Sequence, residues 1–263
     1  MDMISKNLKI VNIDQANVSI QNIAFSYGYG VYENIRVTNN KIRYLDEHID
    51  RLFISLRMLS IVSPFSQEQI TKACEELNKQ VADETYNLKI ILIGGDSPEL
   101  FILPLKPKFV DRKTYRDGAK VITVEYERYL PQVKSLNMLG SYLVYKQAQE
   151  VGAYDALLVD RNGAIPEGSR TNFYALKANV IYTAPDEKVL AGVTRKHILD
   201  FATQQGFSIE FETPKLQDLQ KYDSLFISNT SSKLLPISQI NNEIELTIPK
   251  NLLELCSDFR KQY

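Results

Sequence analysis

The sequence predicts a mixed α+β fold (mixed α/β) that is divided into two α/β domains. Apolar residues recur at helical spacing in some stretches and alternate or run continuously in others, and both kinds occur in each half of the chain. The stretches do not follow the strict strand–helix alternation of a parallel sheet. A polar, interrupted stretch at 106–120 is the best candidate for a boundary. We therefore predict a smaller N-terminal domain at 1–112 and a larger C-terminal domain at 117–263.

Turn signals and capping residues define the elements of the first half. Asn39 and Asn40 suit a tight hairpin turn, and Asp46 suits the N-cap of a helix whose apolar residues recur at helical spacing. The predicted elements are, in order, strands at 8–13 and 17–25, a turn at 26–30, a strand at 31–37, helices at 46–59 and 66–81, and strands at 88–96 and 100–107.

Asparagine and glycine mark the turns of the second half. The pair Asn162-Gly163 is a strong hairpin signal, Ala178-Asn179 suits a second turn, and Gly206 suits a helix C-terminus. The predicted elements are, in order, a strand at 120–128, a helix at 135–152, a hairpin at 155–168, a strand pair at 171–183, a helix at 192–206, strands at 207–213 and 223–230, and a helix at 251–263.

The composition is that of an ordinary globular protein. Of the 263 residues, 44% are hydrophobic and 24% charged, and a net charge of −1 without a basic block argues against a nucleic-acid surface. No apolar run approaches the roughly 20 residues that span a bilayer, and the first residues lack the apolar core of a signal peptide. Cys74 and Cys256 lie outside CxxC or Cys/His patterns, and two histidines are too few for a His-based metal site. We expect no metal, no membrane segment and a cytoplasmic location.

Lys134 stands alone in the apolar run "LPQVKSLNMLGSYL", residues 130–143, which contains no acidic residue. Lysine is rarely buried without a partner, so Lys134 either reaches water at the edge of the segment or is a buried amine with a chemical role. A desolvated lysine amine forms Schiff bases, as in enzymes that use pyridoxal 5'-phosphate (PLP). Such enzymes also need a partner for the pyridine nitrogen and a phosphate cradle. Taken alone, Lys134 fits a surface lysine better.

Candidates for both further features are present. Glu167, in "IPEGSRTNF", is either a partner for a pyridine nitrogen or an exposed turn acid. The phosphate candidates share free N–H groups, hydroxyls or positive charge: Gly192, Val193 and Thr194 at a helix start, Thr230 and Ser231 after a strand, and Arg51 in "EHIDRL". Singly, each also fits an ordinary helix cap, turn or solvated arginine.

Five motifs occur in order between about residues 22 and 240: "YGYGVYENIRV…EHIDRLFISLRML", "VKSLN", "DALLVDRNGAIPEGSRTNFY", "LAGVTR" and "LFISNTSSKLLPI". Together they resemble the class IV PLP-dependent aminotransferases. This superfamily includes branched-chain and D-amino-acid aminotransferases and aminodeoxychorismate lyase. The resemblance implies the two-domain PLP fold of type IV, D-amino-acid aminotransferase-like, with PLP as cofactor and a homodimer as the working form.

The resemblance also implies roles for single residues. Lys134 matches the lysine that carries the cofactor, and Glu167 matches the glutamate at the pyridine nitrogen. The phosphate would be bound by the remaining matches: Val193 and Thr194 with Gly192, Thr230 with Ser231 beside it, and Arg51. Leu190 resembles the leucine that packs on the cofactor ring. The freed Lys134 amine would then move the substrate Cα proton as general base and acid.

The substrate side gives mixed signals. Asn34 stands where lyases of the family usually carry threonine and branched-chain enzymes glycine, and Gly94 stands where D-amino-acid enzymes carry a carboxylate-binding arginine. Lys89 aligns roughly with an arginine of branched-chain enzymes, so Lys89 or Arg36 would bind a carboxylate. Tyr32 is either a substrate contact or a tyrosine at the edge of the core.

These signals rank the possible activities without deciding between them. The leading hypothesis is an aminotransferase between an amino acid, branched-chain-like, and a 2-oxo acid. The alternatives are aminodeoxychorismate lyase, which makes 4-aminobenzoate for folate synthesis, then a D-amino-acid aminotransferase, and last a protein of this fold that binds without turnover.

Overall fold

The computed structural model describes residues 2–262, and the chain divides into two compact units. The first unit is Met1–Lys108 with Val133–Met138, and the second is Phe109–Gln132 with Leu139–Tyr263. Both units combine helices with a sheet, which confirms the mixed α+β class. Lys134 groups with the N-terminal unit, whereas the sequence placed it in a C-terminal domain. The division at 1–112 and 117–263 stays a prediction.

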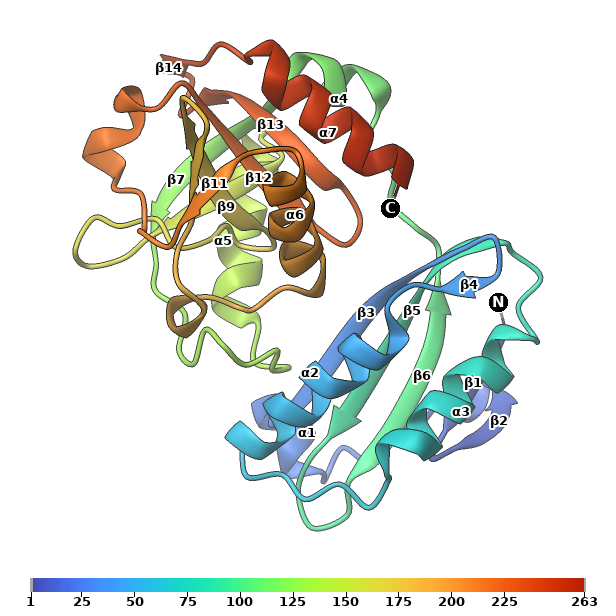
Figure 1. The fold of residues 1–263 in the computed structure, drawn as a ribbon. Helices are drawn as coiled ribbons and strands as arrows, with labels where there is room; N and C mark the ends of the chain where they lie inside the picture. Colours follow the sequence, from blue (N-terminus) through green and yellow to red (C-terminus); the bar gives the residue numbers. More distant parts are fainter. Residues whose placement is uncertain (1, 263) are drawn as a thin grey trace. The chain divides into compact units, whose positions relative to one another are not determined.

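The first unit is an antiparallel sheet covered on one face by two helices (Figure 1). Within its described residues the strand order is β2-β1-β6-β5-β3-β4. The elements of this unit are β1 (Met3–Lys6), β2 (Lys9–Asn12), η1 (Ile13–Gln15), α1 (Ile23–Tyr27), β3 (Gly30–Thr38), β4 (Lys41–Ile42), α2 (Leu45–Met58), α3 (Gln67–Asn78), β5 (Thr85–Ile93) and β6 (Glu99–Leu105).

Strand alternation decides which side chains of β3 meet the helices. Val31, Ile35 and Val37 are fully buried, and Glu33 lies on the same side of the strand and contacts α2. Tyr32, Asn34 and Arg36 alternate with these residues and therefore point from the opposite face of the sheet. A face that is apolar except for Glu33 and a second, mixed face thus come directly from the period of two in "VYENIRV".

The segment Val133–Met138 extends this sheet along the free edge of β3. The Tyr32 N–H donates to the Lys134 carbonyl over 3.0 Å, and the Leu136 N–H donates to the Gly30 carbonyl over 2.9 Å. Val31 and Ser135 form an antiparallel bridge, which puts Tyr32 directly opposite Lys134. The predicted helix at 135–152 therefore begins only at Leu139, because the preceding residues pair with a strand.

The second unit is built around a larger mixed sheet. Within its described residues the strand order is β11-β10-β9-β12-β13-β7-β8, with β14 paired to β13. The elements of this unit are α4 (Arg112–Asp117), β7 (Ala119–Glu125), α5 (Leu139–Glu150), β8 (Asp155–Val159), β9 (Asn172–Lys177), β10 (Val180–Tyr182), η2 (Asp186–Lys188), α6 (Val193–Gln204), β11 (Ser208–Glu210), η3 (Leu216–Lys221), β12 (Ser224–Asn229), β13 (Lys233–Ile240), β14 (Ile244–Glu245) and α7 (Lys250–Gln262).

The central strands of this sheet are buried on both faces. Tyr174 and Phe226 stack at 4.6 Å between ring centroids in the core beneath α6 and α7. Phe173 and Ile227 point from the other face into a second core, which η3 helps to close. Continuous apolar runs such as "SLFIS" are what two-sided burial requires.

Other sequence predictions about local structure also differ from the fold. Residues 17–25 do not form a strand: Asn22 caps the short helix α1, which Gly28 ends with φ +64°. Asp46 lies in the first turn of α2 rather than at its N-cap, which is Tyr44. The sequence also missed β13, whose partners β12 and β7 lie on either side of it.

Candidate functional site

In the first unit, Lys134 lies on the mixed face of the sheet beside an aromatic ring. Its Nζ is 4.5 Å from the ring centroid of Tyr32, its cross-strand neighbour. The Nζ of Lys89, on β5, is 5.6 Å from the same ring. Tyr32 thus holds two ammonium groups by cation–π attraction, and all three side chains are half-buried. This brings Lys134 together with two of the predicted substrate residues.

The other two predicted substrate residues belong to the same face. Asn34 lies directly opposite Lys89 in the β3–β5 ladder, and Arg36 lies opposite Asn87. Arg36 is buried, with 7% of its surface exposed, whereas Asn34 is half-buried. In the β5–β6 ladder, Lys89 lies opposite the apolar Leu103. The face therefore offers cations next to apolar surface.

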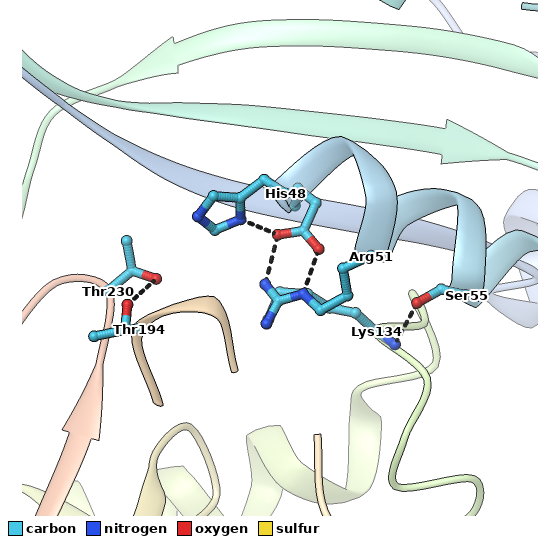
Figure 2. Close-up of polar contacts among 7 residues, drawn as sticks. His48, Arg51, Ser55, Lys134, Thr194 and Thr230 are labelled. Atoms are coloured by element: carbon cyan, nitrogen blue, oxygen red, sulfur yellow. Dashed lines mark hydrogen bonds and ion pairs between the residues drawn. The ribbon is translucent and has the colours of Figure 1, made fainter. Parts of the chain in front are cut away.

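Arg51 is not the solvated arginine that its position on a helix would allow. Its Nε donates to Glu33 Oε1 over 2.8 Å and its Nη2 to Glu33 Oε2 over 2.6 Å, and His48 Nδ1 lies 2.7 Å from Glu33 Oε2 (Figure 2). Burial alone would raise the pKa of Glu33, but the Arg51 charge and the bonds from His48 and Arg51 outweigh it and lower that pKa to about 2. Burial lowers the pKa of His48 below 6.5. The sequence did not identify Glu33 or His48.

In the second unit, Glu167 is a buried carboxylate with only 4% of its surface exposed. Its Oε1 accepts a hydrogen bond from Nη1 of Arg128 over 2.8 Å, and its Oε2 accepts one from the Leu190 N–H over 3.4 Å. The alternative of an exposed turn acid is therefore wrong. The second contact brings Leu190 and Glu167 together, while Arg128 is a partner that the sequence missed.

The loop that carries Glu167 is built around a second buried carboxylate, Asp155 at the start of β8. Asp155 is fully buried and accepts hydrogen bonds from the hydroxyls of Ser169 and Thr171 and from the N–H groups of Ala156 and Arg170. A Cβ at Gly168 would collide with Thr171 Oγ1 and lie 2.8 Å from Asp155 Oδ2, so only glycine fits at this turn. No pattern in the sequence singles out Asp155.

The predicted phosphate residues of this unit meet at the start of α6. Gly192 is the N-cap and provides no side-chain cap, and a Cβ there would lie 2.5 Å from Asn172 Oδ1. The Thr194 and Thr230 hydroxyl oxygens are 3.4 Å apart, although they come from a helix and from the end of a strand (Figure 2). The N–H groups of a helix start and two hydroxyls form a donor set that suits an anion.

Val193 and Ser231, two other predicted phosphate residues, are more strongly involved in the local structure. Val193 is buried at 6% exposure and has an apolar side chain, so only its N–H group could face an anion. The N–H of Ser231 already donates to Asn229 Oδ1 over 2.8 Å, within a turn that Asn229 also closes through Ser232. The structure thus places Thr230, more than Ser231, beside Thr194.

Two other kinds of feature are absent from the described part of the chain. Among residues 2–262, no helix is long and apolar enough to cross a membrane. In the same range no three His, Cys, Asp or Glu side chains gather in a way that could hold a metal ion.

Comparison with known proteins identifies the family. A model of the amino-transferase class IV family matches residues 30–240, so the chain belongs to the class IV aminotransferases and is an enzyme that transfers amino groups. A D-alanine aminotransferase of Listeria monocytogenes is 32% identical over 250 residues, which cover 89% of this chain and 86% of that protein. A Methanocaldococcus jannaschii protein provisionally named branched-chain-amino-acid aminotransferase is 32% identical over 281 residues, covering 98% and 96%.

Solved structures share the fold. A branched-chain amino acid aminotransferase solved with pyridoxamine 5'-phosphate, from an organism abbreviated T.th., superposes with a TM-score of 0.91 at 24% identity, covering 98% of this chain and 93% of that one. The branched-chain enzyme of Escherichia coli gives the same TM-score at 22% identity, covering 99% and 94%. These likenesses confirm the predicted family fold.

Proposed function

We propose that this protein is a PLP-dependent amino-acid aminotransferase that moves an amino group between a branched-chain-like amino acid and a 2-oxo acid. The observation that carries the proposal is the half-buried amine of Lys134 on one sheet face with Tyr32 and Lys89. The Lys134 amine beside a second cation, Lys89, suits a site that forms a covalent bond to a cofactor and also receives a carboxylate.

The residues present fit PLP. Gly192 lets the backbone pass close to Asn172 Oδ1, where a Cβ would be only 2.5 Å away, and the helix start next to Thr194 and Thr230 offers N–H and hydroxyl donors for a phosphate. Arg51 would add guanidinium N–H donors for the phosphate, and Glu167 is a buried carboxylate of the kind that a protonated pyridine nitrogen requires. When bound, PLP supplies an aldehyde carbon and an electron-withdrawing ring, which stabilise negative charge at the substrate Cα.

The chain's own residues would then divide the work. Nζ of Lys134 takes the Cα proton as general base and returns it as general acid. The Glu167 carboxylate holds a proton at the ring nitrogen, and Arg128 keeps that carboxylate in place through its 2.8 Å bond. The Thr194 and Thr230 hydroxyls orient the phosphate, and Leu190, whose N–H contacts Glu167, packs on the ring.

The substrate class follows from the mixed face of the first unit. Lys89 has Asn34 on one side and the apolar Leu103 on the other, and Tyr32 lies opposite the apolar Ile91. A cation surrounded by apolar and aromatic side chains suits an amino acid with a carboxylate and an aliphatic side chain. Lysine binds a carboxylate as a point charge, without the fork of an arginine. Arg36 is the second candidate for this carboxylate.

D-alanine is the second candidate donor. Curated relatives at about one-third identity, including the Listeria monocytogenes protein at 32%, are named D-alanine aminotransferases. The lyase alternative has weaker support, because Asn34 occupies the place of the threonine that assists lyase chemistry.

The working form is a homodimer in this proposal, and its location is the cytoplasm. Near the N-terminus, large apolar side chains are exposed on and beside α1: Ile20 at 92%, Ile23 at 69%, Phe25 at 53% and Tyr27 at 73%. Such a concentration is unusual for a free surface and suits contact with a second copy. Both cysteines are free and buried thiols, which suits a reducing compartment. Light scattering should give twice the chain mass, and Phe25→Asp should shift it to the monomer while Val151→Asp, at another exposed apolar residue, should not.

The activity is tested with an amino-donor panel. With 2-oxoglutarate as acceptor, L-valine, L-leucine and L-isoleucine should react faster than D-alanine, and no 4-aminobenzoate should form from aminodeoxychorismate. A preference for D-alanine would replace the substrate assignment, and 4-aminobenzoate formation would replace the reaction itself.

The role of Lys134 is tested with a variant and a matched control. Lys134→Ala should lower turnover by about 10³-fold or more, because both covalent attachment and proton transfer are lost. Lys146→Ala, at an exposed lysine of α5, should leave turnover unchanged. The purified wild-type protein should be yellow, and borohydride should fix the cofactor to the peptide that contains Lys134. A colourless protein that takes up no added PLP would refute the cofactor assignment.

A further inference from the structure

Glu33, His48 and Arg51 form a closed ionic cluster between β3 and α2. His48 and Arg51 are three residues apart and therefore lie on the same face of α2, the face that packs on β3. Glu33 has no exposed surface, His48 has 1% and Arg51 has 9%. Each carboxylate oxygen of Glu33 accepts at least one bond, so the carboxylate spans both α2 side chains.

The charges of the cluster follow from these contacts. Arg51 keeps Glu33 ionised and lowers the pKa of Glu33 to about 2. At neutral pH the two carboxylate oxygens of Glu33 therefore only accept hydrogen bonds. The proton between Glu33 and His48 must therefore sit on Nδ1 of the imidazole, which donates it to the carboxylate. Since burial, together with the charges of Arg51 and Lys134, favours neutral His48, the negative charge of Glu33 is balanced within the cluster by Arg51 alone.

The hydrogen bonds to Glu33 fix the guanidinium of Arg51 in one plane. Two parallel bonds, from Nε and Nη2 to the two oxygens of Glu33, define both the position and the orientation of the group. A single bond to one oxygen would leave the guanidinium free to rotate about it. His48 in turn holds Oε2 of Glu33 from a second direction, so the carboxylate cannot rotate away from Arg51.

We propose that Glu33 and His48 are positioning residues that orient Arg51 for the phosphate group of the cofactor. This inference rests on the proposed function, in which Arg51 contributes to phosphate binding. An oriented arginine binds phosphate better because little side-chain entropy is lost on binding. Phosphate binding therefore depends on a cluster of three residues, of which only Arg51 contacts the ligand.

The experiment measures what the phosphate contributes to binding. For each variant, the apoprotein is titrated with PLP and with pyridoxal, which lacks the phosphate, and the readout is the Kd for pyridoxal divided by the Kd for PLP. A cluster that only stabilises the fold would change thermal stability and leave this ratio unaltered. The positioning role predicts that the ratio falls.

Four variants give the expected pattern. Arg51→Gln should reduce the ratio about ten- to hundredfold, the usual value of hydrogen bonds to a charged group. Glu33→Gln, which keeps the shape of the side chain, should reduce it by at least about fivefold, and His48→Gln by less. Asp46→Asn, at an exposed carboxylate of the same helix, is the matched control and should keep the wild-type ratio.

The double variant separates an indirect role from a direct one. If Glu33 acts through Arg51, Glu33→Gln combined with Arg51→Gln should give the same ratio as Arg51→Gln alone, because nothing remains to be oriented. Additive losses would mean that Glu33 acts on the ligand by another route and would overturn the proposal. Glu33→Asp, which restores the charge at a shorter reach, provides a folded comparison should the glutamine variant be unstable, and it should recover part of the ratio.

The outcomes also separate this inference from the proposed function. If wild-type protein binds neither PLP nor pyridoxal, the cofactor assignment is wrong. If the wild type binds PLP but Arg51→Gln keeps the ratio, Arg51 is not a phosphate ligand and the inference is wrong with it. If Arg51→Gln lowers the ratio and Glu33→Gln does not, only the positioning role is refuted.

Discussion

The two units each contain a fully buried carboxylate, and they stabilise its charge in different ways. Glu33, in the first unit, is held by the charged Arg51 and the imidazole of His48. Asp155, in the second unit, is held by neutral donors, namely two hydroxyls and two backbone N–H groups. A charged partner fixes one side chain in one plane, whereas several neutral donors fix a stretch of backbone. The first arrangement positions an arginine, and the second shapes the loop that carries Glu167.

The largest expected effect is the removal of the neutral network. Asp155→Ala would leave the buried hydroxyls of Ser169 and Thr171 and the Ala156 N–H without their acceptor. At about 1–3 kcal/mol for each unsatisfied donor, offset by relaxation, the free energy of unfolding should fall by about 3–5 kcal/mol. Urea unfolding measures this loss.

The control for this prediction is Asp200→Ala, at an exposed aspartate of α6 in the same unit, which should change the free energy by no more than about 0.5 kcal/mol. If the two variants lose similar amounts, the hydroxyls around Asp155 contribute no more than surface groups do.

The next largest effect is acid sensitivity of the charged cluster. The pKa of Glu33 is lowered from 4.5 to about 2, so its stabilisation is complete above pH 4.5 and is lost as the pH falls toward 2. At 1.36 kcal/mol per unit this is about 3 kcal/mol. The pKa of His48 is also lowered, from 6.5, so the unfolded imidazole takes up its proton first and stability begins to fall below about pH 6.5.

Hydrogen exchange of the amides in α2 and β3, followed from pH 7 to pH 3, would isolate this effect from the second unit. Glu33→Gln should be less stable at pH 7 and should show a flatter decline with acid. An unchanged slope in the variant would mean that other groups cause the acid sensitivity.

How much of this could be predicted depends on whether a feature is local. Lys134, Glu167 and the helix start at Gly192 carry recognisable motifs, and the structure places Thr230 beside Thr194 as those motifs imply. Glu33 also left a signal, because it occupies the apolar phase of "VYENIRV", where an unpartnered charge would be costly. The sequence analysis did not use that signal or the helical spacing of His48 and Arg51, so it missed the cluster.

The features that sequence reasoning missed depend on distant pairing. Residues 135–138 were predicted as the start of a helix, but they extend the sheet along β3, about a hundred residues earlier in the chain. β13 was missed for the same reason, since its partners β12 and β7 decide its conformation. Arg128 and Asp155 lie 39 and 14 residues from Glu167 and Ser169, and nothing in their own surroundings marks these contacts.

A smaller effect is expected when the neutral network is distorted rather than removed. Gly168→Ala would place a methyl group against Thr171 Oγ1 and 2.8 Å from Asp155 Oδ2, so the loop must move to relieve the overlap. Overpacking of this kind typically costs about 1–3 kcal/mol. Gly163→Ala, at a turn glycine with open space around it, tests backbone strain alone because its φ is +73°. A larger loss at Gly163 than at Gly168 would show that strain, not crowding of Asp155, dominates this loop.

The smallest effect, and the sharpest test of the comparison, is the loss of one neutral donor. Thr171→Val keeps the shape of the side chain and removes the 2.7 Å bond to Asp155 Oδ2, while the same oxygen still accepts the Arg170 N–H. The free energy of unfolding should therefore fall by only about 1 kcal/mol.

In the charged cluster, Arg51→Leu removes the cation that is paired with Glu33 and should cost about 3–5 kcal/mol, because a buried charge is left unbalanced. Equal losses in the two variants would show that Asp155 depends on Thr171 as strongly as Glu33 depends on Arg51. The distinction between one of several neutral donors and a single charged partner would then be wrong.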